Sequence, residues 1–198
     1  MKFRIYNIIQ NQDLQHKINC MMPSECPIFD GSEVDIIALG KLEFEILKSP
    51  GIISDFFYLT EGVFIFNQKV YDSDLYISFE FACQIVELNV TNTDENIYCA
   101  NITNSVNIVD VNNTIFGTTH EDGEKQILKH VFKPNRISTL RSLLKLAQNG
   151  SRASYCLSPG NGNDFYKDYK KSKANGLLFE EVAVFKQVSR GGDWVLEY

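Results

Sequence analysis

The chain has 198 residues, of which 44% are hydrophobic and 22% charged, so it can bury a sizeable core and is not intrinsically disordered. Its net charge of −6 disfavours binding to nucleic-acid phosphates. The sequence contains no run of about 18 apolar residues and therefore predicts no membrane span.

The start of the chain and its cysteines indicate a cellular compartment. The first residues, MKFRIYNIIQNQD, lack an apolar core and a small-residue cleavage site, so we expect no secretory signal. The cysteines form an odd, scattered set, which is typical of a reducing compartment rather than of a disulfide framework. They are Cys20, Cys26, Cys83, Cys99 and Cys156. Together these features predict a cytoplasmic protein.

Residues 1–52 predict strands that pack on a main domain. Alternating apolar residues favour a strand over residues 3–9, whereas the prolines and glycine of residues 10–32 favour a connecting loop. Residues 33–47 predict a half-buried strand, because apolar residues alternate with glutamates near its end. The Ser-Pro-Gly of residues 49–51 then favours a turn.

Residues 53–198 predict an α+β domain that forms one continuous unit with the N-terminal strands. The apolar residues 55–66 favour a short helix or an irregular segment, and Asn67 precedes a helix-like stretch. Residues 84–90 and 97–102 are rich in residues that favour strands. The polar residues between these two strands predict a hairpin loop.

The following segments predict loops and a second hairpin. Residues 105–111 predict either a strand or a turn, and residues 117–123 predict a polar loop. The apolar runs 142–146 and 153–157 flank an Asn-Gly pair, which favours a hairpin.

An amphipathic helix is predicted over residues 164–174, because Phe165 and Tyr169 share one of its faces. The Asn-Gly pair that follows is expected to cap the helix, and residues 177–185 predict a final strand. The whole pattern predicts an α+β fold with a mixed or antiparallel sheet and a few short helices.

Side chains that could perform chemistry form no known catalytic or metal-binding motif. The three histidines lack the spacing of a metal-binding pair, and Cys156 lies in an apolar run that predicts a buried, inert thiol. Glu180 and Glu181 are neighbours in a predicted strand and would face opposite ways, one exposed and one paired with a basic residue of the last third. We predict that the chain is not an enzyme and uses no cofactor or metal.

Charge is unevenly distributed along the chain. Residues 60–124 hold 11 acidic side chains and one basic side chain, whereas residues 125–198 hold 13 basic and 6 acidic ones. The acidic segment either attracts a basic protein or is neutralised by the basic segment within the fold. The first alternative predicts carboxylates as partner contacts and tyrosines as anchors. The acidic candidates are Asp72, Asp74, Asp94, Glu95, Glu121 and Asp122, and the aromatic candidates are Tyr71, Tyr76 and Tyr98.

A string of short motifs spans residues 53–185. It consists of Asp55-Phe56, FIFNQKV at 64–70, IYCANITN at 97–104, Val109-Asp110, VFK at 131–133, Phe165-Tyr166 and NGLLFEEV at 175–182. This string resembles the family of bacterial immunity proteins formerly described as a domain of unknown function (DUF1629), which are encoded beside polymorphic or contact-dependent toxins. The chain departs from the family pattern at Cys99 and Ala100, where larger apolar residues are usual.

The resemblance implies inhibition of a toxin by tight binding, and it supplies no catalytic residues. We therefore expect an immunity protein that neutralises a cognate, basic toxin domain, without nucleic-acid or membrane partners. Two alternatives stay open. A pocket that gathers Cys or His with Asp or Glu would favour an enzyme with an unrecognised active site, and a large apolar surface would favour a self-associating scaffold.

Overall fold

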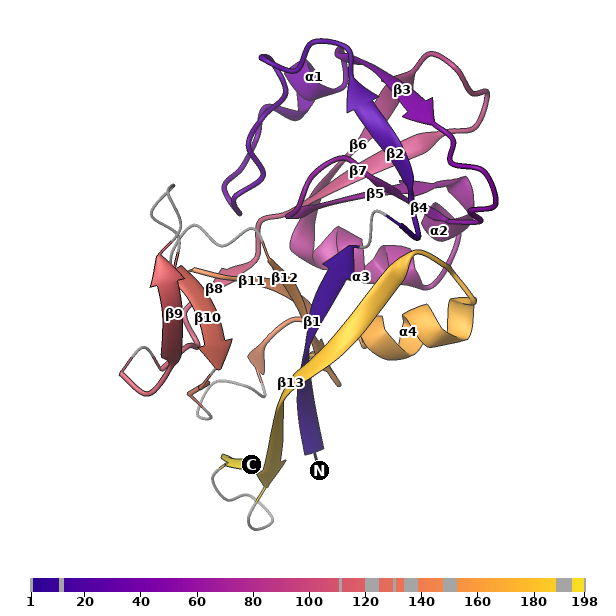
Figure 1. Cartoon of the computed structure of the whole chain (residues 1–198). Helices are drawn as coiled ribbons and strands as arrows, with labels where there is room; N and C mark the ends of the chain where they lie inside the picture. The colour runs from indigo at the N-terminus through magenta and orange to yellow at the C-terminus, as the bar shows by residue number, and fades with distance from the viewer. Residues whose placement is uncertain are drawn as a thin grey trace.

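The structure is a computed structural model that describes residues 2–10, 13–110, 112–119, 125–129, 131–133, 139–147, 153–187 and 194–197. In this part of the chain a closed six-stranded barrel and a six-stranded sheet are joined by short helices (Figure 1). The predicted α+β class, with mixed or antiparallel sheets and a few short helices, is confirmed.

The barrel has an apolar interior that a loop residue helps to fill. In order around the barrel, its strands are β2 (His16–Cys20), β3 (Glu43–Leu47), β6 (Cys83–Val90), β7 (Ile97–Ile102), β5 (Val63–Asn67) and β4 (Phe56–Tyr58). Phe44 and Ile65 are fully buried inside it. Phe29, from the loop after β2, packs into the same cluster, and the short helix α1 (Ile36–Leu39) follows this loop.

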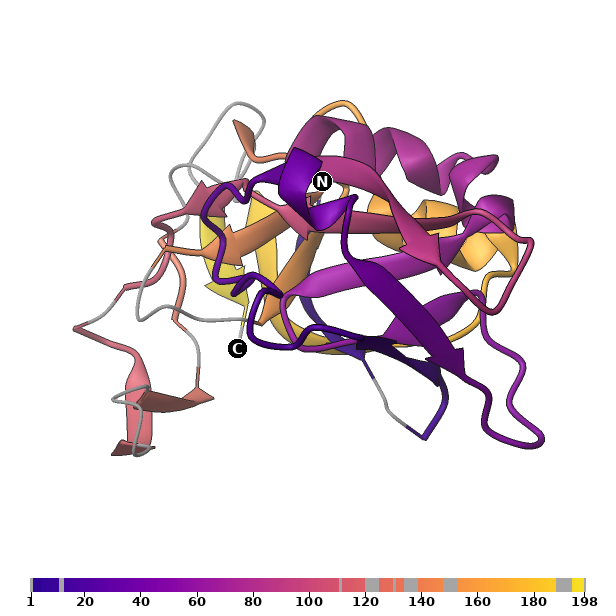
Figure 2. The same cartoon turned by 90° about the horizontal axis from the view of Figure 1, so that it is seen from above.

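The second sheet has the start of the chain at its centre. Its strands in order are β14 (Trp194–Glu197), β13 (Leu177–Gln187), β1 (Lys2–Gln10), β12 (Ser154–Ser158), β11 (Leu143–Leu146) and β8 (Ser105–Val106). Only β8 and β11 pair in parallel among these described strands. A separate hairpin of β9 (Ile115–Thr119) and β10 (Lys125–Lys129) lies to one side (Figure 2).

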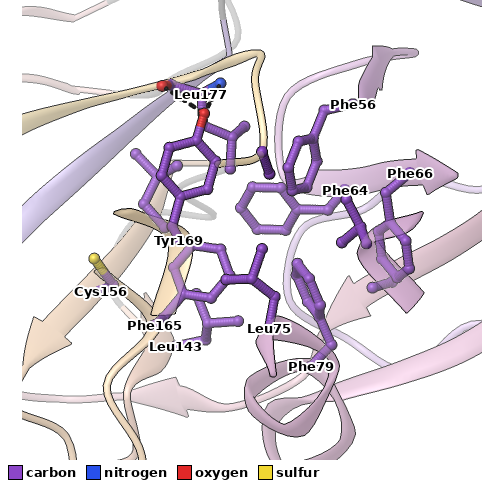
Figure 3. Packing of buried hydrophobic residues seen from close by; sticks show 14 of the residues in the cluster. Phe56, Phe64, Phe66, Leu75, Phe79, Leu143, Cys156, Phe165, Tyr169 and Leu177 are labelled. Carbon is purple, nitrogen blue, oxygen red and sulfur yellow. Dashed lines mark hydrogen bonds between the residues drawn. The ribbon is translucent and has the colours of Figure 1, made fainter. Parts of the chain in front are cut away.

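An aromatic core joins the barrel to the sheet. The helices α3 (Leu75–Ala82) and α4 (Phe165–Ser172) lie against the outer face of the barrel. Phe64 of β5 contacts Phe79 of α3 and Phe165 of α4, with ring centroids 5.5 and 6.2 Å apart (Figure 3). Leu143 and Cys156 complete this core from the sheet. The burial of these rings stabilises the arrangement of barrel, sheet and helices.

Several predicted elements are confirmed. Among the strands, these are the first strand β1, the hairpin of β6 and β7, and the antiparallel pair of β11 and β12. The helix-like stretch after Asn67 forms α2 (Gln68–Tyr71) and α3, and the predicted amphipathic helix is α4. As predicted, Phe165 and Tyr169 are both buried on one face of α4. A helix or strand that buries one face places apolar residues at regular intervals, so the pattern can be seen in the sequence.

Other predictions are wrong in whole or in part. The predicted loop of residues 10–32 contains β2, and residues 55–66 form β4 and most of β5 instead of a helix or an irregular segment. The half-buried strand predicted over residues 33–47 is confirmed only as β3, because α1 precedes it. The strand β9 extends into the predicted loop of residues 117–123, of which residues 120–123 lie outside the described ranges, and β14 follows the predicted final strand. The strand β5 was hidden because Val63–Phe66 are all buried. A strand covered on both faces has no alternation of apolar and polar residues.

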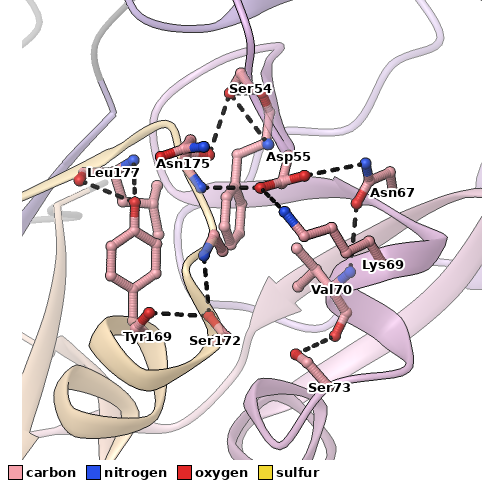
Figure 4. Close-up of polar contacts among 12 residues, drawn as sticks. Ser54, Asp55, Asn67, Lys69, Val70, Ser73, Tyr169, Ser172, Asn175 and Leu177 are labelled. Atoms are coloured by element: carbon pink, nitrogen blue, oxygen red, sulfur yellow. Dashed lines mark hydrogen bonds and ion pairs between the residues drawn. The ribbon is translucent and has the colours of Figure 1, made fainter.

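Asp55 is a buried junction between three segments (Figure 4). Its Oδ2 atom accepts hydrogen bonds from Lys69 Nζ at 2.8 Å and from the backbone N–H of Asn175 at 3.0 Å. Its own backbone N–H donates to the Asn175 carbonyl at 3.1 Å. Asn67 Nδ2 donates to Asp55 Oδ1 at 3.5 Å, while Asn67 Oδ1 accepts from the N–H of Val70 and caps α2. One carboxylate therefore holds β4, α2 and the α4–β13 loop together.

Gly176 allows the α4–β13 loop to approach this junction. Its φ is +115°, and a Cβ atom there would overlap the hydroxyl of Ser54. The predicted cap of α4 by the Asn-Gly pair is wrong, because Lys173, in the left-handed conformation with φ 57°, is the C-cap residue that follows Ser172. Gly176 is therefore needed for the close approach of the loop to Ser54, and it does not cap the helix.

Lys145 is a fully buried lysine in β11. Its Nζ atom donates a hydrogen bond of 2.7 Å to the carbonyl of Phe29, the loop residue that packs into the barrel. The bond ties the barrel loop to the sheet. A buried carbonyl that loses its donor retains the full cost of desolvation.

We expect Lys145→Met to lower the free energy of unfolding by about 2 kcal/mol, because the methionine fills space but leaves the Phe29 carbonyl without this donor. Urea denaturation followed by circular dichroism measures the change. Lys41→Met, at an exposed lysine, is the matched control and should cost less than about 0.5 kcal/mol. Equal stability of the two variants would contradict the role given to Lys145.

Candidate partner-binding surface

Three tyrosines from separate elements pack against one another and form what we call the tyrosine stack, in which Tyr71 and Tyr98 are stacked and Tyr76 is tilted by 48° against Tyr71. The rings of Tyr71 in α2 and Tyr98 in β7 are 4.2 Å apart with an interplanar angle of 19°. The ring of Tyr76 in α3 lies 4.4 Å from that of Tyr71. Tyr98 is largely buried and also stacks on Phe66, whereas Tyr71 and Tyr76 are partly exposed. The fold therefore brings together all three tyrosines that were predicted as anchors.

Polar neighbours hold the tyrosine stack in place. The Tyr98 hydroxyl donates to Gln68 Oε1 at 2.7 Å, and Gln68 Nε2 donates to Asp72 Oδ1 at 2.8 Å. Burial and the neighbouring Tyr71 hydroxyl raise the pKa of Tyr76, so its phenol stays neutral. A stack that is fixed in this way loses little side-chain entropy when it enters an interface.

Exposed carboxylates surround the stack. Glu80 follows Tyr76 by one turn of α3 and so lies on the same side of the helix. Glu87 in β6 is the direct ladder partner of Tyr98 and therefore faces the same side of the sheet. Glu80 and Glu87 were not among the predicted acids. Glu80 could have been found from its spacing to Tyr76, but Glu87 required the strand register.

The loop between β6 and β7 continues this acidic region. Asp94 and Glu95 lie in the loop and are exposed. Together with Glu87 they line a depression of about 370 Å³. Asn96 connects the loop to the stack, because its Nδ2 atom donates to the Tyr98 hydroxyl at 3.5 Å.

We name this region the acidic tyrosine face. It consists of Tyr71, Tyr76, Tyr98, Asp72, Glu80, Glu87, Asp94 and Glu95. Of the predicted acids, Asp72, Asp94 and Glu95 belong to it. Asp74 is instead paired with Lys171 of α4 at 2.9 Å, and Glu121 and Asp122 lie outside the described residues.

Neutralisation of the acidic segment by the basic segment is limited in the described part of the chain. Asp74 is the only acidic residue of 60–124 with an ion pair among the described residues. Lys69, the one basic residue of the segment, is engaged by Asp55. The carboxylates of the acidic tyrosine face are exposed, so they present negative charge to solvent.

The paired glutamates of β13 have a different partner from the one predicted. Both Glu180 and Glu181 are exposed, and Glu181 lies 3.4 Å from Arg4 of β1. The strands β1 and β13 pair antiparallel, and Glu181 lies opposite Tyr6 of β1, two residues from Arg4. The predicted pairing with the basic last third is therefore wrong, because β1 rather than that segment lies next to Glu181.

A cavity of about 470 Å³ beside the barrel gathers two thiols. It is lined by Asn19, Cys20, Pro23, Cys26, Pro27, Ile28, Phe29, Leu59, Thr60 and Glu61. Burial, with a smaller contribution from Cys20, raises the pKa of Cys26 to about 11. Burial also raises the pKa of Cys156, in line with the predicted buried thiol. No group of three His, Cys, Asp or Glu side chains in the described ranges is arranged to hold a metal ion.

We expect Cys26 in the folded protein to react with iodoacetamide at pH 8 about 100-fold more slowly than in the unfolded chain. A pKa of about 11, against an ordinary value of 9.0, leaves far less of the reactive thiolate. Timed labelling followed by mass spectrometry of the peptides gives the rate, and the same chain in urea is the control. Similar rates in both states would contradict the raised pKa.

Comparisons with known proteins leave the family of this chain open. No family model matches the sequence, and no curated protein shows significant similarity to it. Among the described residues, no helix has the length and apolar character needed to cross a membrane.

Proposed function

We propose that this chain is an immunity protein that binds a cognate toxin domain and neutralises it through the acidic tyrosine face. One observation above all supports the proposal: exposed carboxylates without ion pairs to other described residues surround a fixed stack of tyrosines. The resemblance of the sequence motifs to bacterial immunity proteins supports the same function.

The two kinds of side chain in the face would act differently in binding. Carboxylates accelerate the encounter with a positively charged domain and orient it. Tyrosines supply contact area at low entropic cost and are frequent at the energetic centre of interfaces. A toxin that acts on nucleic acid has a positive surface for phosphates, and an acidic inhibitor can cover that surface.

The test is co-expression with the toxin encoded beside this chain. We expect the full chain to restore growth of cells that express the toxin and to form a stable complex with the purified toxin domain. A non-cognate toxin is the matched control and should not be neutralised. Absence of protection, together with absence of a complex, would contradict the proposed function.

A further inference from the structure

The cavity beside the barrel has apolar walls and one carboxylate. Its volume of about 470 Å³ lies in the range of small-molecule binding sites. Pro27, Phe29 and Leu59 form part of its walls, and Phe29 belongs to the barrel core. Among the described residues that line the cavity, Glu61 is the single charged side chain. A lining of this kind disfavours an anion and suits a cation with an apolar body.

A second cavity, of about 120 Å³, adjoins the same carboxylate. The turn of residues 59–62, which connects β4 to β5, borders both cavities, and Glu61 lines each of them. Gln10 and Ser154 also line the second cavity. Gln10 Nε2 donates to the Val63 carbonyl at 2.5 Å, which leaves Gln10 Oε1 as a further acceptor. This oxygen and the hydroxyl of Ser154 are buried and have no hydrogen-bond partner in the part of the chain that the structure describes.

The polar groups around the second cavity require a donor. Buried polar atoms without a partner are rare in proteins, and an amide oxygen such as Gln10 Oε1 can only accept. Glu61 is exposed, and its carboxylate forms no ion pair with a described residue. A primary ammonium carries three N–H donors and one positive charge, so it matches both the acceptors and the carboxylate. The apolar walls disfavour a bare metal ion, which needs about six oxygen ligands.

We propose that this site binds a small primary amine with an apolar ring, such as an arylalkylamine. The ring lies against Phe29 and Leu59, and the ammonium is held by Glu61 and turned toward the second cavity. A ring fills the walls of the larger cavity, whereas the thin side chain of a lysine from another protein would leave them partly empty. The residues of the acidic tyrosine face line neither cavity, so the test of this site does not depend on the proposed function.

The test is titration of the full reduced chain with 2-phenylethylamine at pH 7 in 0.15 M KCl, followed through the amide signals by NMR. We expect one molecule to bind per chain with a dissociation constant below about 1 mM, and the signals of residues 19–29 and 59–62 to shift. 2-Phenylethanol lacks the charge, whereas methylamine and Nα-acetyllysine amide lack the ring. Each of these three compounds should bind at least about tenfold more weakly than 2-phenylethylamine.

Two pairs of variants locate the site. Glu61→Gln should weaken binding by about tenfold, and Glu180→Gln, at an exposed glutamate outside both cavities, should leave it unchanged. Ile28→Ser removes part of the apolar wall and should weaken binding by about threefold or more, whereas Ile53→Ser, at an exposed isoleucine outside the lining, should not. Circular dichroism spectra establish that each variant is folded.

The proposal is overturned if 2-phenylethylamine does not bind saturably, or if one of the other three compounds binds equally well. It is also overturned if Glu61→Gln or Ile28→Ser retains the wild-type affinity, or if a control variant loses as much affinity as its partner.

Discussion

Asp55→Ala is expected to lower the free energy of unfolding by about 3 kcal/mol, because the junction between β4, α2 and the α4–β13 loop loses its common acceptor. The Asn175 N–H would lose its partner inside the protein. Lys69 is half exposed, so water can hydrate its ammonium group once Asp55 is removed. The loss of stability is therefore smaller than for a fully buried ion pair. For a chain of this length the change corresponds to a fall of about 10 °C in melting temperature, measurable by calorimetry.

Two further variants distinguish the junction from a simple effect of charge. Asp55→Asn keeps one acceptor oxygen and should recover about half of the lost stability. Asp30→Ala removes an exposed carboxylate elsewhere and should cost less than about 1 kcal/mol. If Asp55→Ala were as stable as Asp30→Ala, the three segments would be held by packing alone.

Neutralisation of three carboxylates on the acidic tyrosine face is expected to weaken toxin binding by about 100-fold, mostly through slower association. The variant is Glu80→Gln/Glu87→Gln/Glu95→Gln. These side chains are exposed and form no side-chain hydrogen bond or ion pair with other described residues, so the stability of the fold should stay unchanged. Asp72 and Asp74 are left intact because they bind Gln68 and Lys171. Surface plasmon resonance at about 0.15 M ionic strength, where the Debye length is about 8 Å, gives both rate constants.

The matched control neutralises the same number of exposed glutamates away from the face. Glu25→Gln/Glu33→Gln/Glu180→Gln changes the net charge equally, and each of these residues is exposed. We expect association with the toxin to slow by less than about threefold, because distant charges are screened by salt. Similar effects of the two triple variants would mean that net charge, and not this surface, governs binding.

The elements that could be predicted have an exposed face or a turn signal beside them. The helix α4 has one buried and one exposed face. The strands β7 and β11 are buried throughout, but a polar loop precedes β7 and an Asn-Gly pair follows β11 in the sequence. The strands β4 and β5 could not be predicted, because Phe56 and Phe57 and the residues Val63–Phe66 are buried without alternation. The short strand β2 was hidden within a segment dominated by turn-forming residues, where tertiary pairing overrides local preference.

The candidate surface could be predicted only in composition. The sequence indicates that residues 60–124 are acidic and that Tyr71, Tyr76 and Tyr98 are candidate anchors, but not that their rings are in contact. That contact depends on the packing of α2 and α3 against β7, which joins residues that are distant in sequence. Glu87 was missed for the same reason, since its position opposite Tyr98 follows from strand register.

The motif residues also acquire a physical explanation. Asp55, Asn67, Lys69 and Asn175 come from three separate motifs of the sequence, yet they meet in one hydrogen-bonded junction. Gly176 permits the close approach of that loop to Ser54. These parts of the motifs therefore specify the fold, and partner recognition is expected from the acidic tyrosine face, which contains fewer of the motif residues.

Amide hydrogen exchange of the chain, free and bound to its cognate toxin, tests the central claim most directly. If the acidic tyrosine face is the docking surface, binding should slow exchange in α2, in α3 and in the loop of residues 91–96, where its side chains are anchored. The exposed loop of residues 21–28 should exchange at the same rate in both states. Protection of that loop or of the β13 surface, with α2, α3 and the 91–96 loop unchanged, would contradict the account.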